Sequence, residues 1–219
     1  MIKNKLSELL SERGLKTSRV AKDVGIARSS LTSMIYNDNE MLRYDSIDKL
    51  CRYLNITPTD FFEFVPMDID MVAENTFQIL NFVSTDNLMD LAETIRFISL
   101  ECELLIDIEY KNEKSSFDCI VFLEKISYEG ANNKFIFKIK NENSFIELKE
   151  MISLLTPGLK NILFKKVNKI LQSHFMNAIL KEADSEIAFP DFNVNEKEII
   201  LNSIKNATFV IDSKIISEY

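Results

Sequence analysis

The 219-residue sequence has few of the residues that build disulfide, metal or phosphate-binding sites. Its three cysteines, Cys51, Cys102 and Cys119, are widely spaced, and with a single histidine they make no zinc-binding pattern. Four glycines are too few for a phosphate cradle, and no P-loop, GxGxxG or HExxH motif occurs. We therefore expect buried free thiols, with no cofactor and no metal.

Long apolar runs are also missing. No run approaches the roughly 18 residues that a membrane-spanning helix needs. The opening segment MIKNKLSELLSERG reads as a charged amphipathic helix, without the apolar core or cleavage site of a signal peptide. These absences predict a cytoplasmic protein that does not engage a membrane.

The net charge of −8 is unevenly distributed. Residues 1–36 carry seven Lys/Arg and three Asp/Glu, a net charge of +4, whereas residues 66–219 carry sixteen and twenty-five, a net charge of −9. A basic N-terminal region can bind DNA through a local patch, while the acidic remainder discourages non-specific binding.

Residues 1–65 read as a domain of five short helices. The first ends at Gly14, the second spans 18–24 with Thr17 as its N-cap, and a turn at Gly25 leads to the third, about 28–36. Asn37 suits the left-handed end of that third helix. The fourth helix has its N-cap at Asp45 or Ser46, and Thr57-Pro58-Thr59-Asp60 opens a fifth that ends near 62–64. Pro66 marks the domain boundary.

Residues 66–219 read as a single α+β domain. Apolar residues occupy the even positions from Ile98 to Tyr110, and acidic residues (Glu101, Glu103, Asp107 and Glu109) fall on the other, solvent-facing side of this strand. Turns at 112–115 and 130–133 lead into strands at about 117–128 and 135–139, which suggests an antiparallel meander. Helices are expected over 145–156 and 158–183, broken at Pro157-Gly158, and near 195–205. Residues 67–96 are ambiguous, although 87–97 favours a helix, and the segment through Pro190 and the stretch 208–211 are not placed.

The segment TSRVAKDVGIARSSLTSMIY, residues 17–36, carries the strongest functional signal. A helix-turn-helix needs a small residue where its helices approach, a glycine in the turn and apolar residues that lock the helices together. Ala21 is the small residue and Gly25 the turn. The locking positions are filled by Val20, Val24, Ile26, Leu31 and Met34.

On these residues, and on SIDKLCRYLNITPTDFF further along, residues 1–65 resemble the lambda-Cro/cI-like (XRE-type) helix-turn-helix repressors of phages and bacteria. The resemblance covers about 30% of the chain. It implies a transcriptional regulator of the repressor type whose third helix lies in the major groove of an operator. Two positions depart from the family pattern: Asn37 replaces a glycine, and Ala27 replaces a hydroxyl residue that caps the recognition helix.

Carried over by position, the resemblance implies base contacts from Arg28, Ser29, Thr32 and Ser33, with Ala27 at the start of the helix. Arg28 is the best candidate for base readout, because a guanidinium bonds bidentately to guanine. Phosphate contacts are expected from Thr17, Ser18 and Arg19 at the start of the second helix. Further candidates around the DNA backbone are Ser30, Tyr36, Asn37, Asn39 and Arg43.

No catalytic constellation is recognisable, so we expect no enzymatic activity. The serine-lysine peptidase domain that some such repressors carry is rejected, because nothing near Gly130-Ala131 resembles a nucleophile motif. His174 lies among apolar residues in a helical stretch and reads as structural.

Binding is the function left for residues 66–219. The preferred hypothesis is a homodimer on a near-palindromic operator, of phage or mobile-element type, released by an inducer or antirepressor. A second hypothesis is a regulator whose α+β domain senses a small molecule or peptide. A third is an antitoxin-like protein whose α+β domain neutralises a protein partner.

Overall fold

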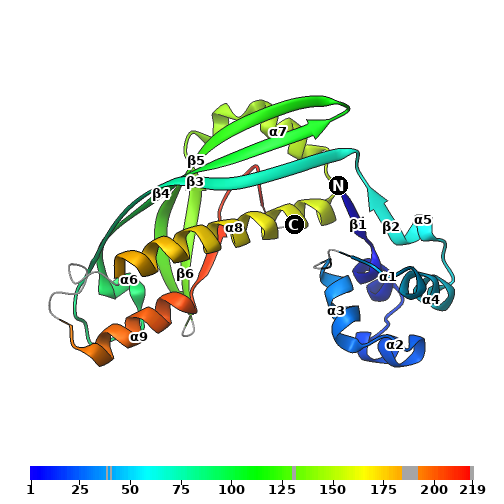
Figure 1. Cartoon of the computed structure of the whole chain (residues 1–219), viewed down its shortest axis with the longest axis horizontal. Coiled ribbons are helices and arrows are strands. Elements are labelled where there is room, and N and C mark those ends of the chain that lie inside the picture. The colour runs from blue at the N-terminus through cyan, green and yellow to red at the C-terminus, as the bar shows by residue number, and fades with distance from the viewer. Residues whose placement is uncertain (38, 40, 130–131, 184–191, 218–219) are drawn as a thin grey trace. The chain divides into compact units, whose positions relative to one another are not determined.

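The chain divides into two compact units in the computed structural model (Figure 1): Met1–Met67 and Asp68–Tyr219. The structure describes all residues except 38, 40, 130–131, 184–191 and 218–219. The start of the turn expected at 130–133 and the segment around Pro190 therefore lie outside the described residues. Each unit is described by itself.

The first unit is helical. Its helices are α1 (Leu6–Glu12), α2 (Thr17–Val24), α3 (Arg28–Tyr36), α4 (Tyr44–Leu54) and α5 (Pro58–Phe61). Each contributes apolar side chains to one core, because none of these short helices is stable without tertiary packing. The most deeply buried members are Leu6, Val20, Leu31, Leu50 and Phe61.

Residues in the left-handed conformation end several of these helices. Gly14 follows α1 with a φ of 61°, and Asn37 follows α3 with a φ of 54°, which confirms both predicted helix ends. Asn55 ends α4 in the same way. At α5, Thr57 and Asp60 form the capping box read from the sequence.

Two predicted N-caps are wrong. The N-cap of α2 is Lys16, and Thr17 is the first helical residue. The N-cap of α4 is Arg43, so Asp45 and Ser46 lie inside the first turn, where Ser46 is buried. Helical backbone begins directly after extended residues at 16 and 43, and no side-chain cap forms at either start. Tertiary packing, rather than capping chemistry, sets these two boundaries.

A small antiparallel sheet was not expected from the sequence. Strand β1 (Ile2–Asn4) pairs with β2 (Phe62–Phe64), with Ile2 opposite Phe64 and Asn4 opposite Phe62. The N-terminal helix therefore starts at Leu6 rather than at the first residues, and the fifth helix ends at Phe61. Three-residue strands are too short for a period to show, and only their pairing stabilises them.

The second unit contains a five-stranded sheet in the order β3–β4–β5–β6–β7. The strands are β3 (Met67–Phe82), β4 (Ile95–Tyr110), β5 (Glu113–Glu129), β6 (Asn132–Ile139) and β7 (Thr208–Ile211). Neighbours β4, β5 and β6 are antiparallel, but β7 runs parallel to β6. The sheet is thus mixed and larger than the expected meander, because a distant segment joins its edge.

The alternation expected in β4 is present. Leu100, Cys102, Leu104, Ile106 and Ile108 are all buried, while the odd positions between them are partly or fully exposed. The turn into β5 is tighter than predicted: Lys111 and Asn112 both have positive φ, and Tyr110 pairs directly with Glu113. Such a two-residue turn matches the twist of the flanking strands.

The buried face of the sheet packs against α8 (Pro157–Ala183). One stripe of this helix, repeating every fourth residue, is buried. Phe175 in the stripe stacks on Phe137 of β6 with 4.7 Å between ring centroids. The stripe consists of Leu159, Leu163, Val167, Leu171, Phe175 and Ile179.

The helices around α8 depart from expectation at one point. After the 3-10 turn η1 (Glu142–Ser144), α7 spans Ile146–Ser153, and α9 spans Val194–Lys205. The break between α7 and α8 lies at 154–156, so Pro157-Gly158 opens α8 rather than interrupting the chain. Proline suits this first helical position because its missing N–H needs no partner there.

The segment 67–96 forms mainly strand, and the helix favoured over 87–97 is wrong. Only α6 (Leu91–Thr94) is helical, and β4 already begins at Ile95. In β3 the buried positions are odd up to Met71 and even from Leu80 onward. Asn75, with a φ of 50°, lies where the phase changes, as an extra, bulged residue would cause. The broken alternation hid this strand from the sequence reading.

Candidate nucleic-acid interface

The turn between α2 and α3 depends on Gly25. Its φ of 68° lies in the left-handed region, which favours glycine, and the Ile26 N–H then donates to the Ala21 carbonyl at 3.1 Å. Val20, Ala21, Leu31 and Met34 are buried beneath the turn, and Val24 and Ile26 pack against them. The locking residues predicted from the sequence are confirmed as core, and they fix the angle at which α3 leaves the turn.

The face of α3 away from this core is polar. Ala27, Arg28, Ser29 and Ser30 are exposed, and Thr32 and Ser33 are half-buried. The predicted base-contacting residues therefore share one accessible surface over the first two turns of α3. Their short hydroxyl side chains leave the approach to Arg28 unobstructed.

Arg28 differs from the other arginines near this surface. Arg19 lies 3.7 Å from Asp23, and Arg43 donates from Nε to Asp45 at 3.2 Å. Among the residues that the structure describes, Arg28 has no such carboxylate partner. A guanidinium without an internal partner keeps all its donors for a ligand, and bidentate recognition requires this.

The start of α2 presents backbone donors. No side chain caps its first turn, and the first intrahelical bonds to Lys16 come from Arg19 and Val20. The N–H groups of Thr17 and Ser18 therefore point out of the helix end, where the helix dipole favours an anion. Thr17 is half-buried, while Ser18 and Arg19 are exposed beside these N–H groups.

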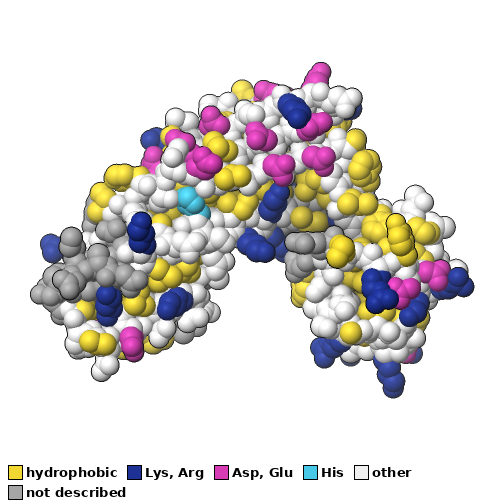
Figure 2. Space-filling model, viewed as in Figure 1, with side chains coloured by type: hydrophobic (Ala, Val, Ile, Leu, Met, Phe, Trp, Pro, Cys, Tyr) yellow, Lys and Arg dark blue, Asp and Glu magenta, His cyan; other side chains and the backbone are white. Residues whose placement is uncertain are grey.

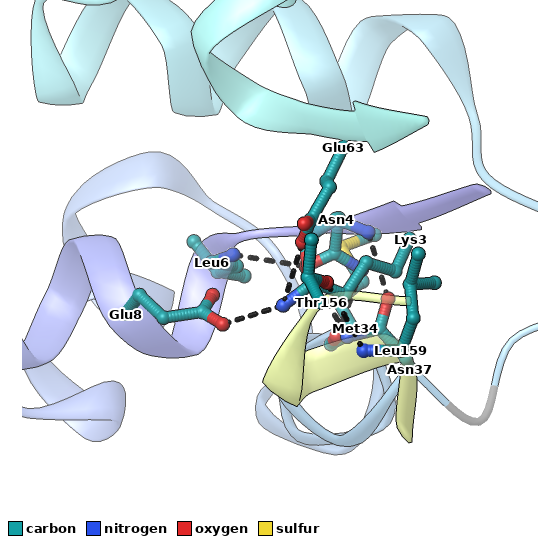
Figure 3. A network of polar contacts seen from close by, with 9 residues as sticks. All are labelled: Lys3, Asn4, Leu6, Glu8, Met34, Asn37, Glu63, Thr156 and Leu159. Atoms are coloured by element: carbon teal, nitrogen blue, oxygen red, sulfur yellow. Dashed lines mark hydrogen bonds and ion pairs between the residues drawn. The ribbon is translucent and has the colours of Figure 1, made fainter. Parts of the chain in front are cut away.

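Asn37 has an internal role that the sequence did not reveal. Its Oδ1 accepts from the Asn4 N–H at 2.8 Å, and its Nδ2 donates to the Asn4 carbonyl at 3.1 Å (Figure 3). The Asn4 side chain in turn donates from Nδ2 to the Met34 carbonyl and accepts from the Leu6 N–H. This Asn4–Asn37 pair holds the C-terminal end of α3 against β1. Both polar atoms of Asn37 are thus engaged within the domain.

The ammonium group of Lys3 is not accessible at the surface of the domain. Its ammonium lies 2.6 Å from Glu8 and 3.1 Å from Glu63, and its side chain is only 4% exposed (Figure 3). Burial alone lowers the pKa of Lys3, but the hydrogen bonds and charges of Glu8 and Glu63 outweigh this and hold it above the ordinary value. Lys3 therefore stays charged and ties β1 to α1 and β2.

A groove of about 290 Å³ lies beside α3 and the start of α4. It brings together four predicted contact residues: Ala27, Ser30, Asn39 and Arg43. Lys49 also lines it, at 3.9 Å from Asp45, and the sequence reading missed this residue. Asp45 and Lys49 are one helical turn apart, and this spacing could have indicated that Lys49 lies on the same side of α4 as Asp45. Tyr36 is exposed but does not line this groove.

A scan against protein-family models matches residues 5–67 to the Cro/C1-type HTH DNA-binding domain. Residues 5–67 are a Cro/C1-type helix-turn-helix domain. The match runs from the start of α1 to the end of β2, so it covers the helix-turn-helix and the groove beside α3 but not β1, and it supports a DNA-binding transcriptional regulator. No curated protein and no solved structure matches the chain.

Outside this Cro/C1-type domain, the chemistry-bearing residues are built into the fold. Like Cys51 inside the domain, Cys102 and Cys119 are buried free thiols, and burial raises the pKa of both Cys102 and Cys119 to about 12. His174 shares a hydrogen bond between its Nε2 and the Thr76 hydroxyl of β3, and burial lowers its pKa. These side chains stabilise the second unit.

Two further findings concern the described part of the chain. It contains no group of three or more His, Cys, Asp or Glu side chains placed to hold a metal ion. None of the helices described there is long and apolar enough to cross a membrane.

Proposed function

We propose that the protein is a dimeric repressor that reads a near-palindromic operator through α3. The observation that carries this proposal is the exposed Arg28 at the first turn of α3 of a Cro/C1-type domain, where no carboxylate among the described residues pairs with it. In helix-turn-helix domains the N-terminal residues of the second helix of the motif contact base edges in the major groove. Ser29, Thr32 and Ser33 flank Arg28 and contact bases or bridging water.

The DNA backbone is held on both sides of the recognition helix. Thr17, Ser18 and Arg19 bind phosphate at the start of α2, where uncapped N–H groups meet the positive helix end. Ser30, Asn39 and Arg43 lie along the groove beside α3 and contact the adjacent backbone. Phosphate contacts of this kind fix the register of the domain but carry little sequence information.

A single domain of this size reads only a few base pairs. Two domains about 34 Å apart contact successive major grooves on one side of the duplex. The unit Asp68–Tyr219 supplies the dimer contact, and its net acidity discourages binding elsewhere on DNA. It also receives the inducer or antirepressor, and it has no catalytic role.

DNA selection with the full-length protein, followed by footprinting, tests the proposal. We expect a two-fold symmetric site with half-sites about one helical turn apart. Arg28→Ala should cost about 1–3 kcal/mol of binding free energy and relax the preference at one base position in each half-site.

Arg52→Ala is the matched control. Arg52 is an exposed arginine on α4 that bonds to Asp48, so its removal should leave sequence preference unchanged. If Arg28→Ala keeps the wild-type preference, base readout by Arg28 is refuted. A single asymmetric half-site would refute the dimeric operator.

A further inference from the structure

The two faces of the five-stranded sheet differ in their surroundings. On the face that packs against α8, Leu104, Cys119 and Phe137 are fully buried. On the opposite face, every second side chain of β4, β5 and β6 whose burial the structure describes is partly or fully exposed. We call this the open sheet face. It consists of Glu101, Glu103, Leu105, Asp107 and Glu109 of β4, Lys114, Ser116, Asp118, Ile120, Phe122 and Lys125 of β5, and Lys134, Ile136 and Lys138 of β6.

Charge on the open sheet face differs between its two outer strands, while β5 between them carries both signs, with Lys114, Asp118 and Lys125. The β4 side carries Glu101, Glu103, Asp107 and Glu109, and the β6 side carries Lys134 and Lys138. Asp and Glu side chains gather over the part of the sheet where β3, β4 and β5 run (Figure 2). Between the acidic and basic strands, β5 contributes the apolar side chains of Ile120 and Phe122.

The strand register places these groups in rows across the sheet. Glu101 pairs with Phe122, and Phe122 pairs with Lys138, so one row reads acid, aromatic, lysine. In the next row Glu103 pairs with Ile120, and the Lys140 N–H donates to the Ile120 carbonyl at 2.8 Å. Both rows therefore run from a carboxylate through an apolar side chain to a lysine.

From this pattern we infer that the open sheet face is the dimer interface, covered by a second copy related by a two-fold axis parallel to β5. Such an axis lays β4 of one copy over β6 of the other. Glu101 then faces Lys138 of the second copy, and Phe122 at the centre faces its own equivalent. This axis also brings Asp118 opposite its own equivalent, but an axis perpendicular to the strands would lay β4 over β4 and set all four carboxylates of β4 against those of the second copy.

Self-complementarity is what an isologous two-fold contact requires. Two sheets stacked about 10 Å apart with aligned strands form a standard sandwich. Lys138 already contacts Glu124 within its own chain at 2.5 Å, but an ammonium has three donors and can serve a second carboxylate. The charge rows also select the axis parallel to β5 over the axis perpendicular to the strands, since like charges in an interface are costly.

The inference rests on the proposed dimeric function and is tested by charge reversal in the full-length protein. Glu101→Lys places lysine over lysine in its homodimer, and Lys138→Glu places carboxylate over carboxylate. Each variant alone should dimerise about tenfold or more weakly than wild type by sedimentation equilibrium. In an equimolar mixture both contacts of the heterodimer are complementary, so dimerisation should return.

The mixture separates an interface effect from a folding defect, because a misfolded chain would not be rescued by its partner. Glu198→Lys, an exposed acid on α9 away from the sheet, is the control and should leave dimerisation unchanged. Phe122→Asp should abolish the dimer, whereas Ile199→Asp, an exposed apolar position on α9, should not.

Single variants as dimeric as wild type, or a mixture that stays monomeric, would overturn the open sheet face as the interface. If the wild type is then still a dimer on a symmetric operator, the proposed function stands and the contact lies elsewhere. A monomeric wild type that protects a single half-site would overturn both.

Discussion

The position of the recognition helix should depend on Asn37, which combines a left-handed backbone with two side-chain hydrogen bonds to Asn4. Asn37→Gly keeps the backbone conformation but removes both bonds, each worth about 0.5–1.5 kcal/mol net. We therefore expect a local loss of about 1–3 kcal/mol. Asn37→Ala removes the same bonds and adds about 1–2 kcal/mol of left-handed strain, so it should lose more.

Hydrogen exchange of the α3 amides in the full-length protein measures this loss locally. A change of about 1–3 kcal/mol corresponds to a fall in protection of roughly 5- to 150-fold. Asn55 ends α4 with the same left-handed backbone, so Asn55→Gly is the matched control and should leave α3 protected. If Asn37→Gly protects α3 as well as wild type does, the Asn4–Asn37 pair does not hold the helix. Equal losses of α3 protection for Asn37→Gly and Asn37→Ala would refute the argument that alanine adds left-handed backbone strain.

Two other predictions concern stability. Phe175→Ala removes a fully buried ring that stacks on Phe137, and should lower the free energy of unfolding of the second unit by about 3–5 kcal/mol in urea titration; a loss under 1 kcal/mol would contradict the packing of α8 on the sheet. Hydrogen bonds from the Thr57 side chain and backbone lower the pKa of Asp60. Its carboxylate therefore stabilises α5 above its unfolded pKa, and the contribution is lost as pH falls through the lower folded value. Protection of the α5 amides against hydrogen exchange should fall over that acid range, and Thr57→Ala should weaken this pH dependence because only the backbone hydrogen bond to Asp60 remains; a variant that keeps the wild-type profile would refute the capping role of the side chain.

The sequence predicted the helix-turn-helix because its signals are local. Gly25 and Asn37 mark left-handed helix ends, and the spacing of Val20, Leu31 and Met34 defines the packing between helices. Each of these residues acts within a few positions along the chain, where sequence patterns are informative. The same argument explains why the alternation in β4 was readable.

The role of Asn4 could not be predicted, since its partners lie about thirty positions away at Met34 and Asn37. The side chains that contact the buried ammonium of Lys3 include Glu63, at the opposite end of the domain sequence. From sequence patterns alone, a lysine is expected to be solvated and an asparagine is expected to lie in a turn or at a helix end. Only folding brings β1 beside β2 and the end of α3.

The sequence alone predicted that residues 1–65 form a DNA-binding domain whose third helix presents Arg28 with a row of hydroxyl side chains. Tertiary structure decided what lies around them. It inverted the phase of β3 at Asn75, placed β7 parallel to β6, and aligned Glu101, Phe122 and Lys138 in one row. Strand register and sheet order are set by contacts between distant segments, whose partners no local period specifies. The surface on which two copies would meet is therefore a property of the sheet and not of any one strand.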